Sequence, residues 1–175
     1  QFTPDHVERC WAFVGKQTFR HDLHCDYKSN RKPAEPGMLR CIREAWASLT
    51  GHGVRSWAVE GFEGDDLIAS LVESSGEETV VMAGNDKDLR QLIEGGRVAQ
   101  LLSAKWDDEQ RKYVNQWQNE HSLMRTIPPD GWGIHPYQCV DFQCLAGDSV
   151  DRIRGADGIG EKRAWLLLRE YQDLP

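Results

Sequence analysis

Two clusters of acidic residues, each lying where a predicted strand ends and a predicted helix begins, constrain this chain most. The first covers residues 61–66 (GFEGDD) and the second covers residues 84–88 (GNDKD). A helical face of Leu67, Ile68, Leu71 and Val72 follows the first cluster, and a β-prone run over residues 80–82 precedes the second. If the two strands are parallel neighbours, their carboxyl ends meet, and both clusters face one crevice.

Crowded carboxylates resist ionisation unless a multivalent cation binds them. For one cluster alone, the alternative is ordinary negative charge in a helix's first turn, which stabilises the helix dipole. A third acidic turn, residues 147–151 (GDSVD), makes capping alone a poor explanation. Oxygen ligands favour Mg²⁺ or Mn²⁺ over zinc. His21, His24 and Cys25 lie together, but no second pair completes a zinc site at the usual spacing.

The composition indicates a soluble domain of ordinary size rather than a membrane protein. The chain has 175 residues, 39% of them hydrophobic, and no apolar run approaches the roughly 18 residues that span a bilayer. The five cysteines are an odd number without framework spacing, which is typical of reduced thiols in a cytosolic protein.

The net charge of −7 is unevenly distributed along the chain. Residues 1–57 carry a net charge of +3, whereas residues 58–110 carry −9. A global count argues against nucleic-acid binding. Basic flanks around an acidic, metal-loaded centre suit an enzyme that binds a phosphate backbone and cuts it.

The remaining secondary structure follows from hydrophobic patterning. Strands are predicted at residues 10–14, 54–59, 80–82 and 98–102, and helices at 36–49, 89–93 and 136–146. The first of these helices should bury Met38, Leu39, Ile42, Ala45, Trp46 and Leu49, and the last should bury Val140, Cys144 and Tyr137. Residues 103–133 are predicted to be irregular, with a hairpin or loop suggested by their aromatic residues.

A basic and aromatic segment, residues 18–33, follows the first strand. Cations alternate there with Phe19 and Tyr27 before a proline-rich turn, as in segments that contact a nucleic-acid backbone and stack on bases. On charge alone, an ordinary solvated loop is the favoured alternative.

Residues 155–160 (GADGIG) alternate glycine with other residues before a predicted helix. Glycine allows close backbone approach, and a helix N-terminus presents free N–H groups, so the segment suits a phosphate. It is not a nucleotide-binding P-loop, because no strand precedes it and no Ser or Thr follows Lys162. A helix, a glycine hairpin and a second helix suit a sequence-independent grip on a duplex, with charge from Lys162 and Arg163. A plain glycine turn is the alternative.

These motifs, taken together, resemble a known family. The segments Phe19-Arg20, 27–31 (YKSNR), 63–66 (EGDD), 86–88 (DKD), 147–151 (GDSVD) and 153–164 occur in the order of the 5′-nuclease superfamily. The chain is most similar to the 5′→3′ exonuclease domain of bacterial DNA polymerase I, which is related to flap endonucleases. The resemblance spans roughly residues 10–173.

The resemblance implies a PIN-like α/β core with a mainly parallel central sheet over residues 1–135, and a helix–three-turn–helix DNA-binding module over residues 136–175. It also implies two divalent ions, Mg²⁺ or Mn²⁺, and K⁺ in the glycine hairpin. The implied function is structure-specific 5′→3′ exonuclease or flap endonuclease activity on DNA flaps, nicks or branches in replication and repair. A polymerase partner or domain, a monomer, and a cytoplasmic, nucleoid-associated location are further expectations.

Roles are implied residue by residue. The metal ligands would be Glu63, Asp65, Asp66, Asp86, Asp88, Asp148 and Asp151, directly or through water. The cations that draw in the scissile phosphate would be Arg20, Lys28 and Arg31, with Tyr27 stacking on a base. Gly158, Ile159 and Gly160 would contact potassium and the duplex through their backbone.

Two departures from the family pattern lead to alternatives. The family's first strand, with its metal-binding aspartate, would lie before Gln1, and Phe13 matches a position that usually carries aspartate. Pro175 falls inside or just after the second helix of the DNA-binding module. The chain is therefore expected to be a fragment or to have an impaired first metal site, with the site of Asp86, Asp88, Asp148 and Asp151 better preserved. A non-catalytic DNA-structure binder and, less favoured, a PIN-type ribonuclease are the alternative functions.

Overall fold

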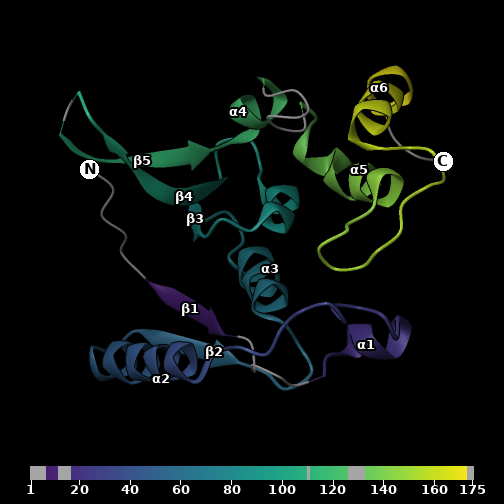
Figure 1. The fold of residues 1–175 in the computed structure, drawn as a ribbon. Helices are drawn as coiled ribbons and strands as arrows, with labels where there is room; N and C mark the ends of the chain where they lie inside the picture. Colours follow the sequence, from purple (N-terminus) through teal and green to yellow (C-terminus); the bar gives the residue numbers. More distant parts are fainter. Residues whose placement is uncertain (1–6, 12–16, 110, 126–132, 173–175) are drawn as a thin grey trace. The chain divides into compact units, whose positions relative to one another are not determined.

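The computed structural model describes residues 7–11, 17–109, 111–125 and 133–172. The chain forms two compact units, residues 1–70 and 71–175, and their boundary falls within helix α3 (Gly64–Ser74). Helices and strands alternate along both units, as expected for an α/β chain (Figure 1).

The first unit is built on a pair of parallel strands. Strand β1 (Glu8–Trp11) pairs with β2 (Arg55–Ala58), and Glu8 lies opposite Arg55 in the register. The Glu8 carboxylate accepts hydrogen bonds from Arg55 Nη1 and Trp57 Nε1, each at 3.0 Å, which ties the two strands together. The second predicted strand is confirmed. The first begins two residues before its predicted start, and Phe13 lies outside the described residues.

Two helices complete the first unit, α1 (Phe19–Leu23) and α2 (Pro36–Gly51). Pro36 at the first helical position of α2 is pre-organised for a helix start, and this predicted helix is confirmed. Its half-buried face consists of Leu39, Ile42, Trp46 and Leu49. Met38 and Ala45 are exposed, so their predicted burial was wrong; the inward stripe is narrower than a full helical face.

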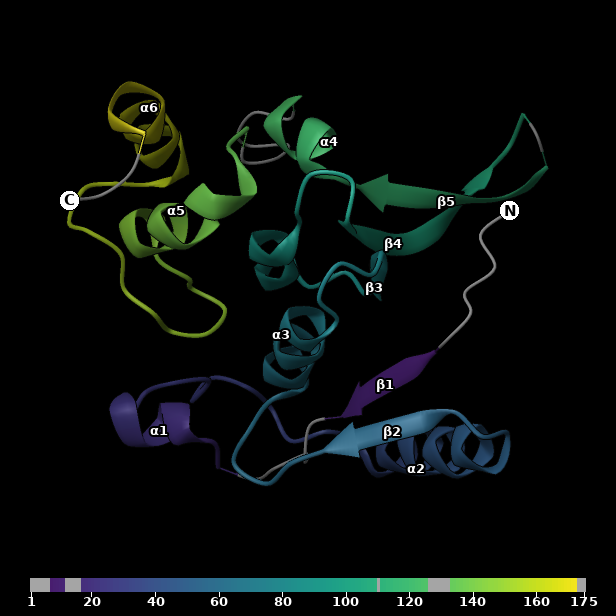
Figure 2. The same ribbon diagram turned by 180° about the vertical axis from the view of Figure 1, so that it is seen from behind.

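The second unit contains a three-stranded mixed sheet. Strand β3 (Val80–Ala83) is parallel to β4 (Val98–Asp107), and β4 is antiparallel to β5 (Lys112–Gln118). The 3₁₀ helix η1 (Lys87–Leu92) stands where an α-helix was predicted. Figure 2 shows the long β4–β5 hairpin from behind.

The hairpin corrects two predictions. Residues 103–133 are not simply irregular, because β4 continues to Asp107, β5 returns, and α4 (Glu120–Arg125) follows. The suggested hairpin is confirmed. The described strands form two sheets rather than one mainly parallel central sheet, and the antiparallel β5 makes the second one mixed.

The carboxyl-terminal part of the second unit is helical. The 3₁₀ helix η2 (Pro136–Gln138) leads into α5 (Cys139–Ala146), and a loop connects α5 to α6 (Glu161–Tyr171). The main hydrophobic core lies here. It consists of Leu123, Ile134, Cys139, Phe142, Leu145, Ala164 and Leu168.

The buried stripe of α5 is Cys139, Phe142 and Leu145, at intervals of three residues. Tyr137, Val140 and Cys144 are exposed, so the prediction placed the inward face one position away from the observed one. A short helix with apolar residues on several sides does not fix its own rotation; the partner helix α6 does, through Ala164 and Leu168.

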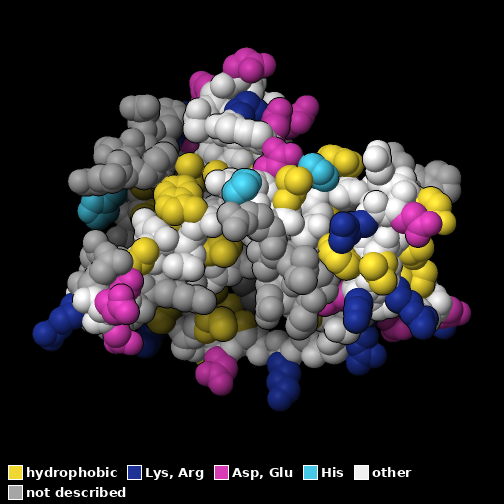
Figure 3. Space-filling view, turned by 90° about the horizontal axis from the view of Figure 1, so that it is seen from above, with side chains coloured by type: hydrophobic (Ala, Val, Ile, Leu, Met, Phe, Trp, Pro, Cys, Tyr) yellow, Lys and Arg dark blue, Asp and Glu magenta, His cyan; other side chains and the backbone are white. Residues whose placement is uncertain are grey.

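Lysine, arginine and hydrophobic side chains are interspersed on the right-hand side of Figure 3, where α6 lies. No helix among the residues described is long and apolar enough to span a membrane.

Candidate metal centre

Three aspartates from the second unit converge. Asp88 lies in the first turn of η1. Asp148 follows Gly147, the C-cap of α5, and Asp151 lies in the turn after it. One carboxylate oxygen from each of the three lies within 4.8 Å of those from the other two. Asp148 and Asp151 are buried and Asp88 is half-buried. Residues more than 50 positions apart thus form one oxygen-lined group.

The turn that carries Asp148 and Asp151 is closed by its own backbone. Asp148 and Ile153 exchange two N–H···O hydrogen bonds of 2.8 Å, which form an isolated antiparallel bridge. The Asp148 carboxylate also accepts hydrogen bonds from the backbone N–H of Val150 (2.9 Å) and Asp151 (3.4 Å). Gly147, with φ +76°, gives the chain the left-handed conformation that starts this turn.

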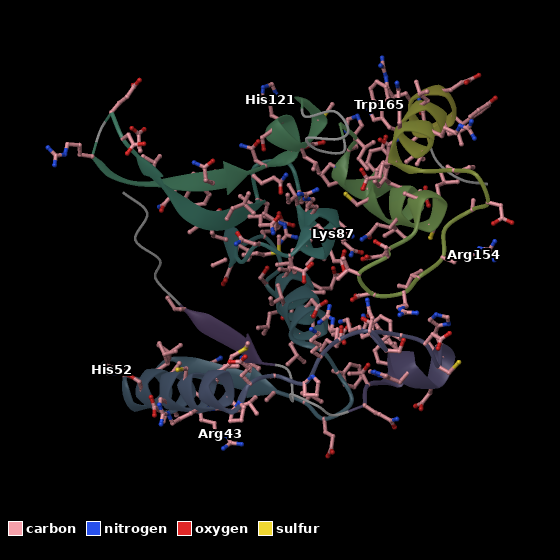
Figure 4. All side chains as sticks on the ribbon, in the orientation of Figure 1. Arg43, His52, Lys87, His121, Arg154 and Trp165 are labelled. Carbon is pink, nitrogen blue, oxygen red and sulfur yellow. The ribbon has the colours of Figure 1, made fainter. Side chains whose placement is uncertain are left out.

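Asp148 is stabilised as a carboxylate. Burial opposes its ionisation, but a hydrogen bond from Lys87 and the backbone N–H groups outweigh burial and lower the pKa of Asp148. The Lys87 Nζ atom lies 2.9 Å from Asp148 Oδ2. Lys87, the first residue of η1, is labelled in Figure 4.

The pKa of Asp88 is shifted in the opposite direction. Burial raises its pKa above the ordinary value, and the negative charges of Asp86 and Asp148 raise it further, although Gln143 Nε2 donates a hydrogen bond to Asp88 Oδ1. Three crowded carboxylates, one of them resisting ionisation, fit a hard divalent cation, which would remove the repulsion between them. Asp86 lies next to the group but outside it. Its side chain caps η1 by accepting the Asp88 N–H at 3.0 Å.

The first acidic cluster lies in the first unit and is paired with cations. Arg20 donates two hydrogen bonds to Asp66, at 2.6 and 2.8 Å, as a bidentate ion pair. Lys28 Nζ lies 2.6 Å from Glu63 Oε2, and the Tyr27 hydroxyl donates to the same oxygen at 3.0 Å. The cations predicted to bind phosphate and the acids predicted to bind metal therefore contact one another.

These contacts shift several pKa values. The hydrogen bond to Asp66 raises the pKa of Arg20 above its ordinary value. For Asp66, burial is outweighed by the Arg20 hydrogen bond and the Glu63 N–H, so the pKa is lowered. Burial raises the pKa of Tyr27 to about 12. The Tyr27 ring is buried, with the His21 ring edge-on at 5.4 Å, so its stacking on a base stays a prediction. Arg31 is exposed and Asp65 half-buried.

The glycine segment joins α5 to α6. Gly158 has φ +73°, and Gly160 is the N-cap of α6. Ile159 packs against the hydrophobic core and anchors the segment, while Arg163 Nη1 donates to the Gly158 carbonyl at 2.6 Å. Lys162 and Arg163 are exposed in the first turn of α6. The arrangement presents backbone N–H groups and two cations on one exposed helix start.

Two residues at the aspartate group were missed by the sequence reasoning. Lys87 stands between Asp86 and Asp88 in the motif, and its position beside two acids could have suggested an ion pair. Gln143 bonds to Asp88 from one turn before the end of α5. A neutral glutamine on a helix carries no signal in sequence, because only the packing of η1 against α5 brings it to Asp88. The single crevice predicted to contain both acidic clusters stays a prediction.

The α/β fold carries a group of three aspartates whose oxygens fit a divalent cation. Residues 1–121 match the family described as 5′-3′ exonuclease, N-terminal resolvase-like domain. The chain belongs to this family. It has the α/β, PIN-like and resolvase-like fold with a mixed sheet.

Several relatives support this placement. The chain is 31% identical to a 5′-3′ exonuclease of Bacillus subtilis over 99% of this chain and 55% of that protein. It is 35% identical to DNA polymerase I of Pseudomonas aeruginosa over 86% of this chain and 15% of that protein. The chain thus spans about half the length of the similar exonuclease and a small part of the polymerase.

Solved structures share the fold. A T5 5′-exonuclease with bound divalent zinc ions has a TM-score of 0.71 at 21% identity, covering 93% of this chain and 58% of that one. A bacteriophage T5 flap endonuclease complex with DNA and metal ions also has a TM-score of 0.71, at 20% identity, covering 94% of this chain and 58% of that one.

Proposed function

We propose that this chain is the nuclease part of a structure-specific 5′→3′ exonuclease or flap endonuclease that hydrolyses DNA phosphodiesters. The observation that carries the proposal is the convergence of Asp88, Asp148 and Asp151 on one group of oxygens. Membership of the exonuclease family supports it, as does the metal content of structures with the same fold. The roles would be removal of 5′ flaps and primers in replication and repair.

Asp88, Asp148 and Asp151 would hold one divalent ion, Mg²⁺ or Mn²⁺, with Asp86 next to them. Glu63, Asp65 and Asp66 are the candidates for a second ion. When bound, such ions lower the pKa of a coordinated water and offset the negative charge of the phosphate. The chain's own contribution is to keep the oxygens in place: Gln143 bonds to Asp88, while Lys87 and two backbone N–H groups bond to Asp148.

The DNA backbone would be bound by cations and by backbone N–H groups. Arg20, Lys28 and Arg31 would attract the scissile phosphate, and Tyr27 would stack on a base if its ring became uncovered. Transition-state charge on a phosphate is stabilised by such pre-positioned cations.

The segment over residues 136–175 would act as the helix–three-turn–helix module of the chain, with residues 1–135 as the nuclease core. Gly158, Ile159 and Gly160 would contact the duplex and bind K⁺ through their backbone, and Lys162 and Arg163 would add charge. The exposed start of α6 and the positive φ of Gly158 support this assignment. Arg154 belongs to the same loop (Figure 4), and its Nη2 atom lies 2.5 Å from Asp157 Oδ1.

Cleavage of a labelled 5′-flap DNA in Mg²⁺, compared with EDTA, tests the proposal. Asp148→Asn should lower turnover by orders of magnitude and leave flap binding in Ca²⁺ largely intact. Glu170→Gln, an exposed carboxylate on α6, is the matched control and should cut like the parent chain. Equal turnover for Asp148→Asn and the parent would remove Asp148 from the site.

The same assay separates the other functions. Flap binding without cleavage in any metal would identify a non-catalytic DNA-structure binder, and preference for single-stranded RNA over the flap would identify a ribonuclease. We also propose a DNA polymerase domain or protein as the partner, because relatives of this chain are DNA polymerases. A monomer and a cytoplasmic location complete the proposal, and light scattering in solution tests the first of these.

A further inference from the structure

Gln100 is a polar residue in the interior of the second unit. Its side chain has 0% exposure, and it is among the largest fully buried side chains of the residues described. The others in that group are apolar, namely Phe142, Leu123, Leu168 and Cys139. Buried amides are retained in proteins when their hydrogen bonds have a specific use.

Both hydrogen bonds donated by Gln100 go to one short loop. Its Nε2 donates to the Gly84 carbonyl at 2.9 Å and to the Asp86 carbonyl at 2.7 Å. Two acceptors at this atom fix the orientation of the amide, because an oxygen there would face two other oxygens. The loop runs from the end of β3 into η1, and it carries Asp86 and Asp88.

The other end of the Gln100 amide is unsatisfied. Its Oε1 is buried and accepts no hydrogen bond from any residue that the structure describes. Gln118 lies opposite Gln100 on β5, and its Oε1 atom is also buried without a hydrogen bond from the described residues. An unsatisfied buried acceptor costs about as much as a hydrogen bond contributes, so the Oε1 atom adds no stability, and the amide acts through the two carbonyls to which its Nε2 donates. The amide is therefore better explained by what it holds than by stability.

A continuous chain of bonds leads from Gln100 to the metal centre. Gln100 holds the Asp86 carbonyl, the Asp86 side chain accepts the Asp88 N–H at 3.0 Å, and Asp88 contributes an oxygen to the three-aspartate group. We propose that Gln100 is a positioning residue that fixes the 84–88 loop so that Asp88 is held ready for a divalent cation. The inference rests on the proposed metal-dependent function and deepens it, since Gln100 itself lies outside the motifs that supply the proposed metal ligands and cations.

The test compares Mn²⁺ binding by the parent chain, Gln100→Leu and Gln100→Met, followed by the electron paramagnetic resonance of free Mn²⁺. Both variants keep roughly the side-chain volume of Gln100 and remove its two N–H donors. Partners behind metal ligands typically change metal affinity by about 10- to 100-fold, and a loss of this size is expected. The metal-free melting temperature should fall in both variants, because the Gly84 and Asp86 carbonyls lose their donor, but the variants should remain folded at the temperature of the metal titration. Gln118→Leu removes the half-buried amide opposite Gln100 on β5 and should leave Mn²⁺ affinity unchanged.

A purely structural role would move the melting temperature and not the metal affinity measured well below it. Flap cleavage gives a second readout: the Gln100 variants should lose rate at low Mn²⁺ and regain it at saturating Mn²⁺. Parent-like Mn²⁺ affinity in either folded variant would overturn this inference alone. Absence of Mn²⁺ binding by the parent chain would overturn the metal centre and this inference with it.

Discussion

A side-chain carbon placed on Gly155 would lie 2.5 Å from the backbone nitrogen of Gly147, so these two glycines meet backbone against backbone. The contact holds the start of the glycine segment against the end of α5. Between the two glycines lies the turn with Asp148 and Asp151. The Ala156 N–H donates to the Leu145 carbonyl at 2.9 Å and closes the same junction.

Gly155→Ala should therefore destabilise the second unit. The added methyl group would meet backbone atoms, which cannot rotate away, and overpacking of this kind costs about 1–3 kcal/mol. Urea unfolding followed by tryptophan fluorescence measures the loss. Gly96→Ala is the control, because a Cβ there would meet nothing within 4 Å. Similar stabilities for the two variants would show that the junction relaxes freely.

Lys87→Met should increase the thermal stability that the chain gains when Mn²⁺ binds. In the metal-free chain, Lys87 offsets the charge of Asp148 across 2.9 Å, and a partly exposed pair of this kind contributes about 1 kcal/mol. Without Lys87, the metal-free melting temperature should fall, and the increase in melting temperature on adding Mn²⁺ should grow, since the cluster keeps more uncompensated negative charge. Arg40→Met, which removes an exposed cation of α2, is the control. An unchanged increment in Lys87→Met would contradict this electrostatic role.

Lys28→Ala should weaken DNA binding in a salt-dependent way. Each phosphate contact contributes about 0.9 to the slope of log affinity against log salt concentration, so loss of one contact should reduce that slope by about 1. Fluorescence anisotropy of a flap DNA across a salt series gives the slope. Lys32→Ala, an exposed lysine in the same segment, provides the comparison. If both variants lower the slope equally, the effect is general charge rather than a contact by Lys28.

The fold was predictable from sequence where the pattern is local. The strand at residues 80–82 and the helix at 36–49 follow from apolar runs bounded by glycine and proline, and both are present. The rotation of α5 was not predictable, because Val140 and Cys139 are both apolar and only packing against α6 selects Cys139. The extent of β4 was missed for a similar reason: its pairing with β5 overrides a weakly hydrophobic sequence.

The candidate site, like the fold, could be predicted from the sequence only in part. Asp88, Asp148 and Asp151 were named as metal ligands because acidic turns of the sequence carry them and those turns resemble the motifs of a known family, and the structure brings the three together. The residues that hold them were not identified. Gln143 and Gln100 are neutral, and their contacts to Asp88 and to the 84–88 loop span 55 and 14 residues of sequence. The ion pairs of Arg20 with Asp66 and Lys28 with Glu63 also depend on tertiary structure, although both partners were named.

Cys139 should make the second unit sensitive to alkaline pH. Burial raises the pKa of its thiol to about 12 from an ordinary 9.0, because the thiolate would lose its hydration. Below pH 9 the thiol is neutral in both the folded and unfolded chain, so nothing is lost. Between about pH 9 and 12 the unfolded thiol ionises and the folded one does not, and stability falls by up to about 1.4 kcal/mol per pH unit. Unfolding free energies of the parent and Cys139→Ala at pH 7.5 and 10.5 measure this, and the parent should lose more. An equal pH dependence of the two chains would contradict the assignment.

Thiol reactivity gives a second measurement of the burial of Cys139. The exposed Cys25, Cys41 and Cys144 should react with a thiol reagent at pH 8, while Cys139 should react only after unfolding.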